Sequence, residues 1–255
     1  MLRTRVIPCL LLKDQGLVKT IKYKDPKYVG DPINAIRIFN DKAVDELMLL
    51  DITATVNGRG PSFDTIESVA SECFMPLAYG GGIRDLEDIR RILAMGVEKV
   101  VINTLALDFE FISKAAKEFG SQAIVASIDV KKKLFGGYEV VTARATKKTG
   151  LDPVSFAKSL ERSGAGEILL SVVDLDGTQQ GYDVGLITQV ADSVGIPVIA
   201  IGGAGKIDDF ELVIRSTRAS AVAAGSMFVF KGVHKAVLIS FPTQEQLINV
   251  RKVDD

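Results

Sequence analysis

The chain has 255 residues, of which 47% are hydrophobic and 25% charged, and its formal net charge is −1. A near-neutral chain has no global field to attract nucleic acid or an anionic membrane, and its apolar stretches are shorter than the roughly 18 residues of a membrane-spanning helix. Because His234 is the single histidine, histidine triads and multi-histidine metal sites are excluded, and we expect no metal and no cofactor.

The two cysteines, Cys9 and Cys73, both lie in apolar surroundings. Such residues are typical of reduced thiols in a protein core rather than of a disulfide framework. No export signal is visible, because the apolar run from Ile7 to Leu12 is closed at once by Lys13 and Asp14. We therefore predict a cytoplasmic protein.

In chain order, short runs rich in Val, Ile and Leu alternate with amphipathic segments such as Leu86 to Leu93 and Phe111 to Phe119. Such runs are typical of parallel strands that are buried on both faces. Eight strands in alternation with helices, in a chain close to the roughly 250 residues usual for this fold, predict a single (β/α)8 barrel domain over residues 1–255. The expected strands are Arg5 to Leu11, Glu46 to Asp51, Pro76 to Tyr79, Lys99 to Ile102, Ala123 to Asp129, Glu167 to Val172, Pro197 to Ile201 and Ser220 to Ala224.

The chain contains an internal repeat. The glycine-rich segment at residues 80–85 returns at residues 202–206, and the strand at residues 100–104 returns at residues 222–226, both at an offset of 122 (202 minus 80, 222 minus 100). Two copies of one unit predict two half-barrels, residues 1–120 and 121–255, that meet near Gly120. Because each copy carries a glycine-rich turn that can hold a phosphate, we expect a ligand with two phosphate-like ends.

Two long connections each follow the first strand of a half-barrel, so both overhang the same rim. Residues 12–31 form a predicted loop of about twenty residues that is rich in lysine, and a loop of this length is typical of a functional lid. A solvated, disordered excursion is the alternative. Residues 131–150 predict a hairpin around Gly136 and Gly137, with a strand from Tyr138 to Ala143.

Polar and glycine residues follow the predicted strands at their carboxyl ends, where the active site of a (β/α)8 barrel lies. Gly80-Gly81-Gly82 alone is more typical of a tight turn than of a phosphate site, but its duplication at Gly202-Gly203 favours phosphate binding. Backbone amides in such turns approach an anion, and hydroxyl groups at the neighbouring strand ends, Thr104 and Ser226, donate further hydrogen bonds.

Asp129 ends the otherwise apolar fifth strand at the predicted mouth. A carboxyl group that is partly desolvated there is suited to proton transfer, because burial raises its pKa towards neutral pH. The alternative is an acid paired with Lys131 to Lys133 or with a backbone amide. Superposition of the two half-sequences places Leu11 opposite Asp129, so that one half carries the acid and the other does not.

These features together resemble one family, the cyclase subunit of imidazole glycerol phosphate synthase, from residue 1 to about residue 230. The matching motifs are Gly30-Asp31-Pro32, Asp45-Glu46-Leu47, Leu50-Asp51-Ile52-Thr53-Ala54, Gly80-Gly81-Gly82-Ile83, Ile102-Asn103-Thr104, Phe119-Gly120-Ser121-Gln122-Ala123, Gly164 to Leu170, Asp176-Gly177-Thr178, Gly181-Tyr182-Asp183 and Gly202 to Lys206. The resemblance implies a bisphosphate ligand across the mouth, with Lys19 closing over it. The residues expected to bind it are Lys19, Asp51, Gly81, Gly82, Asn103, Thr104, Asp176, Gly177, Gly203, Gly225 and Ser226.

The same resemblance implies a gate for ammonia at the opposite end of the barrel. Its four charged residues are expected at Arg5, Glu46, Lys99 and Glu167, each near the start of a predicted strand. The resemblance also implies that a glutaminase subunit docks on this face and forms a heterodimer with the chain. Without the resemblance, four charges of alternating sign at this end would indicate a role in stability alone.

The chain departs from the family pattern at the first catalytic position. The family uses two aspartates, of which this chain keeps Asp129 and replaces the other by Leu11, and Ile201 stands where the family tends to have a small hydroxyl residue. This combination resembles the second-copy paralogues associated with surface polysaccharide loci. It implies that ammonia is diverted, through an ATP-dependent amidotransferase, to an acetamido sugar of lipopolysaccharide. A genuine cyclase of histidine biosynthesis and a non-catalytic, glutaminase-activating scaffold are the alternatives.

Overall fold

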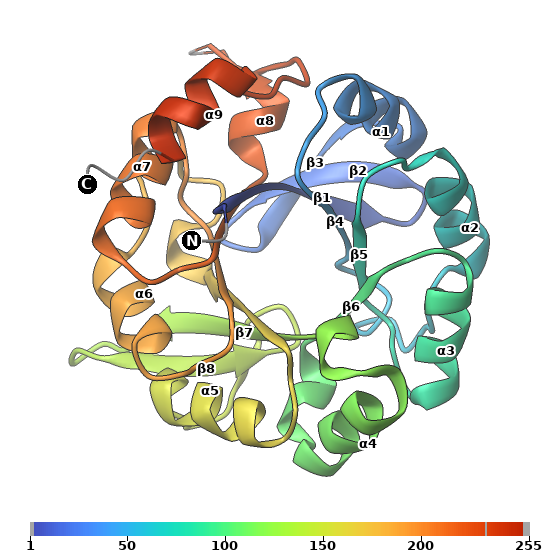
Figure 1. Ribbon diagram of the computed structural model, residues 1–255, viewed down its shortest axis with the longest axis vertical. Coiled ribbons are helices and arrows are strands. Elements are labelled where there is room, and N and C mark those ends of the chain that lie inside the picture. The colour runs from blue at the N-terminus through green and yellow to red at the C-terminus, as the bar shows by residue number, and fades with distance from the viewer. Residues whose placement is uncertain (1–2, 233, 252–255) are drawn as a thin grey trace.

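Eight parallel strands close into a barrel in the computed structural model, which describes residues 3–232 and 234–251 (Figure 1). The final strand pairs with the first, and the two half-sequences join where β6 pairs with β7 and where β12 pairs with β1. The (β/α)8 barrel predicted from the sequence is therefore confirmed. Its strands are β1 (Arg5–Lys13), β4 (Leu47–Asp51), β5 (Leu77–Gly80), β6 (Lys99–Ile102), β7 (Ile124–Lys132), β10 (Glu167–Val172), β11 (Val198–Ile201) and β12 (Ala221–Ala224).

Helices surround the barrel on the outside (Figure 1). Several of them begin after an aspartate whose side chain accepts a hydrogen bond from a backbone amide of the first turn, as Asp31, Asp85 and Asp108 do. Such a cap satisfies one of the amides that the helix itself leaves unpaired. The helices are α1 (Pro32–Asp41), α2 (Phe63–Glu72), α3 (Leu86–Ala94), α4 (Phe109–Phe119), α5 (Pro153–Arg162), α6 (Val184–Ala191), α7 (Ile207–Ser216), α8 (Ser226–Val229) and α9 (Gln244–Arg251), with 3₁₀ turns at Thr104–Leu107, Ser121–Ala123 and Val173–Leu175.

The buried apolar side chains form two clusters that the wall of strands separates. The larger cluster lies between the strands and the helices. The smaller one fills the inside of the barrel, because successive side chains of a strand point to opposite faces of the sheet. Its buried members are Ile7, Cys9, Met48, Ala78, Val101, Val125, Leu169, Ile199, Ala221 and Ala223, and Leu11, Leu50 and Ile201 pack against it.

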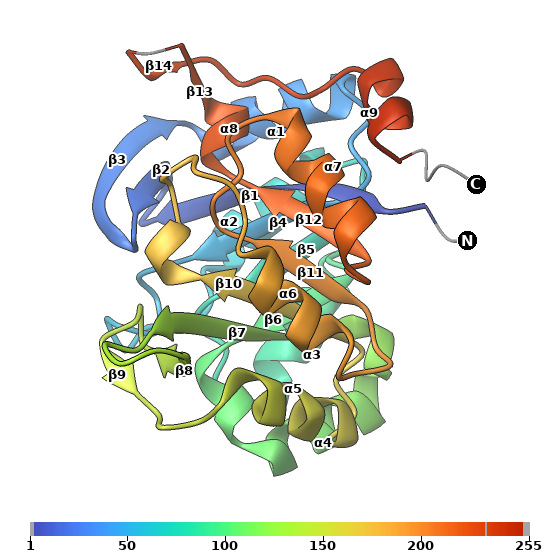
Figure 2. The same cartoon turned by 90° about the vertical axis from the view of Figure 1, so that its left-hand side faces the viewer.

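The segment after β1 is a β-hairpin and not the irregular loop expected over residues 12–31. Strands β2 (Gly16–Ile21) and β3 (Lys24–Gly30) pair with each other, and β2 pairs with the end of β1 (Figure 2). The expectation of a loop and the disordered alternative were both wrong, because residues 17–20 of β2 are buried and β2 pairs with the largely exposed β3. A role of this segment as a lid stays a prediction. Burial of four successive residues stabilises β2 as a strand, although the lysines of the segment give it the composition of a solvated loop.

The hairpin predicted after the fifth strand is confirmed. Strand β7 runs on to Lys132 and pairs with β8 (Tyr138–Thr142), which in turn pairs with β9 (Lys147–Lys148). Both hairpins extend from the same end of the barrel, opposite the start of β1 (Figure 2). They therefore overhang a common mouth.

The last part of the chain packs as a helix over residues 244–251. Before it, β13 (Phe230–Lys231) pairs with β14 (Ala236–Val237), and His234 between them is exposed. Leu247 and Val250 of α9 are buried, and α9 lies against α7. Residues 233 and 252–255, which the expectation for the C-terminal segment also covered, lie outside the described residues. Among the described residues, no helix has the length and apolar character to cross a membrane.

Candidate functional site

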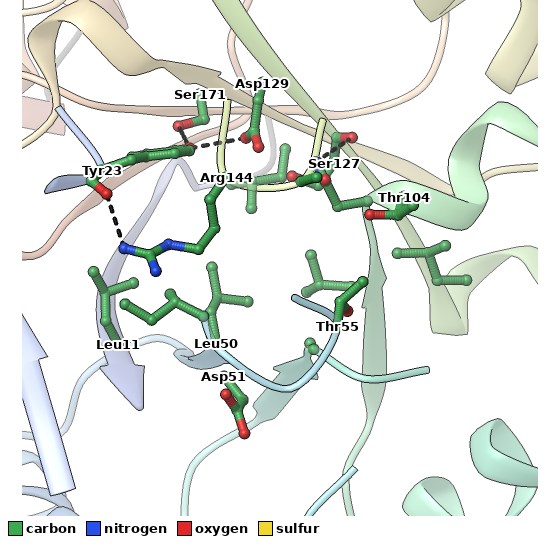
Figure 3. Close-up of a pocket in the computed structure, with 18 of the residues that line it drawn as sticks. Leu11, Tyr23, Leu50, Asp51, Thr55, Thr104, Ser127, Asp129, Arg144 and Ser171 are labelled. Carbon is green, nitrogen blue, oxygen red and sulfur yellow. Dashed lines mark hydrogen bonds between the residues drawn. The ribbon is translucent and has the colours of Figure 1, made fainter. Parts of the chain in front are cut away.

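A cavity of about 160 Å³ opens at the carboxyl ends of the strands (Figure 3). Residues from β1, β2, β4, β5, β6, β7, β10 and β11 line it, together with Tyr23 of the first hairpin and Arg144 of the second. Its polar lining includes three carboxyl groups, Asp51, Asp129 and Asp176, beside hydroxyl, amide and guanidinium groups. The structure thus brings Asp129 and the glycine-rich turn after β5 into one cavity, as the sequence predicts.

Asp129 lies at the mouth end of β7 with only 7% of its surface exposed. Burial raises the pKa of its carboxyl group to about 7, against the lowering effect of hydrogen bonds from Tyr23 and Asn103. A carboxyl group with such a pKa exchanges a proton readily near neutral pH. The alternative, a pairing of Asp129 with Lys131 to Lys133, is absent among the ion pairs of the described residues, and Lys132 contacts Asp183 instead.

Tyr23 is a residue of this cavity that the sequence did not reveal. Its phenol donates a hydrogen bond to Oδ1 of Asp129 at 2.8 Å and lies 2.6 Å from Oγ of Ser171, which then donates to the phenol oxygen (Figure 3). The guanidinium of Arg144 donates to the backbone carbonyl of Tyr23 at 2.9 Å, so the two hairpins meet above the cavity. A separation of 106 residues between Tyr23 and Asp129 leaves no local signal of this contact.

The turn after β5 forms one wall of this cavity. The backbone amide of Gly82 donates to Oγ1 of Thr55 at 3.1 Å. Gly81 has φ of +115°, and a Cβ there would lie 2.3 Å from the carbonyl oxygen of Asp51, so that a glycine is required. Asn103 and Thr104 line the same cavity. Asp51 lines this cavity as well. Its Oδ1 accepts hydrogen bonds from the backbone amides of Thr53 and Ala54, so its side chain holds the start of the loop that follows β4.

A second, smaller cavity of about 40 Å³ lies beside the first. It is lined by the second set of predicted phosphate ligands, Gly177, Gly203, Gly225 and Ser226, and by two further residues that were expected to bind the ligand, Lys19 and Asp176. Lys19 is buried and donates a hydrogen bond to the carbonyl of Cys9, and burial lowers the pKa of its ammonium group. A Cβ at Gly225 would lie 2.2 Å from Nζ of Lys19, so the glycine makes room for this side chain. Lys19, which belongs to the first hairpin, therefore lies within the cavity.

The four predicted gate residues form a closed ring at the opposite end of the barrel. Arg5 contacts both Glu46 and Glu167. Nζ of Lys99 lies 2.9 Å from Oε2 of Glu46 and 3.0 Å from Oε2 of Glu167. Burial alone would lower the pKa of the Arg5 guanidinium, but the hydrogen bonds and charges of the two glutamates raise it above its ordinary value. Each carboxylate thus bridges two cations, with Glu46 only 2% exposed.

Comparison with known proteins gives one consistent family. A family model described as "Histidine biosynthesis protein" matches residues 5–234. A Pseudomonas aeruginosa protein provisionally named imidazole glycerol phosphate synthase subunit hisF2 is 54% identical over 248 residues, which cover 97% of this chain and 99% of that protein. A similarly named HisF of Leptospira borgpetersenii is 48% identical over 244 residues (95% and 96%), and a hisF3 of Vibrio vulnificus is 46% identical over 248 residues (96% and 95%).

Proposed function

Because the chain belongs to the histidine biosynthesis protein family, among the cyclase subunits of imidazole glycerol phosphate synthase, we propose that it is the synthase subunit of a glutamine amidotransferase. In this proposal a glutaminase subunit docks at the ring of Arg5, Glu46, Lys99 and Glu167 and releases ammonia there. The ammonia reaches the mouth of the barrel, where it is used to amidate an acetamido sugar of a surface polysaccharide.

The observation that supports this proposal most directly is the placement of the charged ring and the acidic cavity at opposite ends of one barrel. The space between them is lined by the apolar interior cluster, which includes Ile7, Met48 and Leu169. Burying an ammonium ion among such side chains is costly, whereas neutral ammonia has no charge to desolvate. The ring is therefore the natural point at which the cation is excluded and neutral ammonia admitted.

Leu11 supports the diversion to a substrate other than the one that is cyclised in histidine biosynthesis. It lines the cavity at the end of β1, and its apolar side chain neither gives nor takes a proton. Loss of one of two acid/base groups costs a rate factor of about 10² to 10⁴, so Asp129 alone is a poor basis for ring closure. Amidation of an acetamido group requires that its oxygen be activated before ammonia displaces it, and the proposal therefore includes a separate ATP-dependent amidotransferase.

The proposal is tested by reversing one charge of the ring. Lys99→Glu places three carboxylates beside Arg5 and is expected to reduce glutamine-driven amidation at least about tenfold, because the passage of ammonia is disturbed. Amidation driven by added ammonium salt should stay unchanged, since ammonium salt supplies the mouth directly. The assay uses this chain with a glutaminase subunit of the same family, the ATP-dependent amidotransferase, an acetamido sugar and ATP.

The matched control is Lys114→Glu on the exposed face of α4, where Lys114 pairs with Glu110. It makes the same change of charge away from the ring and should leave both rates unchanged. Equal loss of glutamine-driven activity in the two variants would contradict the gate. A glutaminase that is activated fully while no ammonia appears at the mouth would instead favour the non-catalytic scaffold.

The second candidate function, a genuine cyclase of histidine biosynthesis, is favoured by one observation. The pKa of about 7 at Asp129 lets a single carboxyl group both take and give a proton near neutral pH. A cyclisation assay with ammonium salt separates the candidates. Normal turnover by the unmodified chain supports the cyclase, whereas turnover that appears only in the Leu11→Asp variant supports the diverted function.

A further inference from the structure

The two cavities at the mouth meet at a partition of this chain's own side chains. They share only four lining residues: Cys9, Leu11, Asp176 and Ile201. Leu11 is on β1 and Ile201 on β11, the strands on either side of β12, and both pack on the interior cluster. Two branched apolar side chains therefore lie where the two cavities meet.

Asp176 completes the partition and is held in place. Its Oδ2 accepts hydrogen bonds from Oγ1 of Thr20 at 2.7 Å and from the backbone amide of Tyr23 at 3.3 Å. The first hairpin supplies both donors, so it fixes this carboxyl group between the cavities. A ligand with a phosphate at each end that extended from one cavity to the other would have to pass two apolar side chains and a carboxyl group. Each of these is unfavourable beside a doubly charged ligand.

The two cavities also differ in charge. The smaller one contains Lys19, a buried ammonium group whose hydrogen bond goes to a carbonyl, and the glycine turns that carry backbone amides. The larger cavity has the carboxyl groups of Asp51 and Asp129 in addition to that of Asp176, which both cavities share, and it is also lined by Arg144, which donates to the carbonyl of Tyr23. An anion is thus favoured beside Lys19, while the larger cavity suits an uncharged body with hydroxyl or amide groups.

We infer that Leu11 and Ile201 are specificity-determining residues that separate the two phosphate cradles, namely the glycine turn after β5 and the glycine turns after β11 and β12. The chain therefore binds a ligand through one phosphate, beside Lys19, and does not bind a bisphosphate across both cradles. This deepens the proposed function, on which it rests for the reaction at the site, by restricting the substrate class to one phosphate-bearing end. The repeat in the sequence predicts a ligand with two phosphate ends. In this inference the partition prevents one ligand from reaching both cradles, so the cradle after β5 holds no phosphate of that ligand.

Calorimetric titration of the purified chain tests the inference without any activity assay. The probes are inorganic phosphate, ribose 5-phosphate and ribulose 1,5-bisphosphate. We expect one phosphate bound per chain, at least about tenfold weaker binding in Lys19→Met, and a bisphosphate no more than about threefold tighter than the monophosphate. A ligand that bridged both cradles would gain on the order of 100-fold from the second contact.

The partition itself is tested by Ile201→Ser and by Leu11→Ala with Ile201→Ser. Removing the apolar side chains of the partition should make the chain bind the bisphosphate at least about tenfold more tightly than the monophosphate. Leu50→Ala is the matched control, because Leu50 lines the larger cavity and packs on the same interior cluster but is not shared with the smaller cavity. It should leave the preference unchanged, and circular dichroism checks that each variant is folded.

Several results would overturn the inference. Two equivalent phosphate sites per unmodified chain, or a bisphosphate bound at least about tenfold tighter than the monophosphate, would show that the cradles act together. Absence of phosphate binding, or binding that Lys19→Met does not weaken, would remove the anchor. These outcomes do not involve the ring at the other end of the barrel. The failure of the inference is therefore distinct from the failure of the proposed ammonia transfer.

Discussion

Replacing Asp129 by asparagine should stabilise the fold at high pH. The carboxyl group of Asp129 has its pKa raised by burial from 3.8 to about 7. Between these two values the folded chain keeps a proton that the unfolded chain has released, so the free energy of unfolding falls as the pH rises. Below about pH 4 both states are protonated and no cost remains.

The size of the effect follows from the two pKa values. A shift from 3.8 to about 7 is about three units, and each unit is worth about 1.4 kcal/mol, so the ionised carboxylate costs about 4 kcal/mol above pH 7. Asp129→Asn has nearly the same shape and no charge to bury. We therefore expect the free energy of unfolding to increase by about 4 kcal/mol at pH 8 and to change little near pH 4.

Urea unfolding followed by circular dichroism, at several pH values from 4.5 to 8, measures this difference. Glu67→Gln on the exposed face of α2 is the matched control, because it makes the same change from carboxylate to amide in solvent. It should shift stability by less than about 0.5 kcal/mol at any of these pH values. A gain for Asp129→Asn that is independent of pH, or a loss at pH 8, would refute the argument that burial dominates at this position.

Three further variants test other parts of the structure. Tyr23→Phe removes the donor to Asp129 and should raise the pKa of that carboxyl group further, seen by ¹³C NMR titration of labelled aspartates with Asp129→Asn as the assignment reference. Gly203→Ala places a Cβ 2.0 Å from the carbonyl oxygen of Gly181 at φ of +111°, and should lower the free energy of unfolding by at least about 2 kcal/mol in urea. Glu46→Gln leaves two cations of the ring with one carboxylate fewer, and a loss of about 3 kcal/mol is expected by the same measurement; no loss would mean that the ring is not stabilising.

The barrel was predictable from the sequence because its strands are buried on both faces. Such strands appear as continuous apolar runs, and the eight expected runs correspond to the eight barrel strands with the largest difference, three residues, at the end of β7. The glycine-rich repeat likewise marked both turns, since a Cβ at Gly81 or Gly203 would overlap a backbone oxygen. These features depend on local residue type and period, which the sequence carries directly.

The first hairpin and Tyr23 needed the tertiary structure. The β2 strand is stabilised by burial against β1 and the barrel, while its lysine-rich partner β3 has the composition of a solvated loop. The hydrogen bond from Tyr23 to Asp129 joins residues 106 positions apart and exists only once the first hairpin lies over the mouth. A pattern in the sequence has no means of registering such a contact.

The sequence alone determined where the strands lie, which residues end them at the mouth, and which charges begin them at the opposite end, because chain order and side-chain alternation decide these positions. Only the closed barrel decided how the strand ends are grouped. Closure places Leu11 and Ile201 on either side of β12, between two cavities, and buries Lys19 in one of them. Distance across a barrel depends on which strands become neighbours, and that is a property of the whole fold.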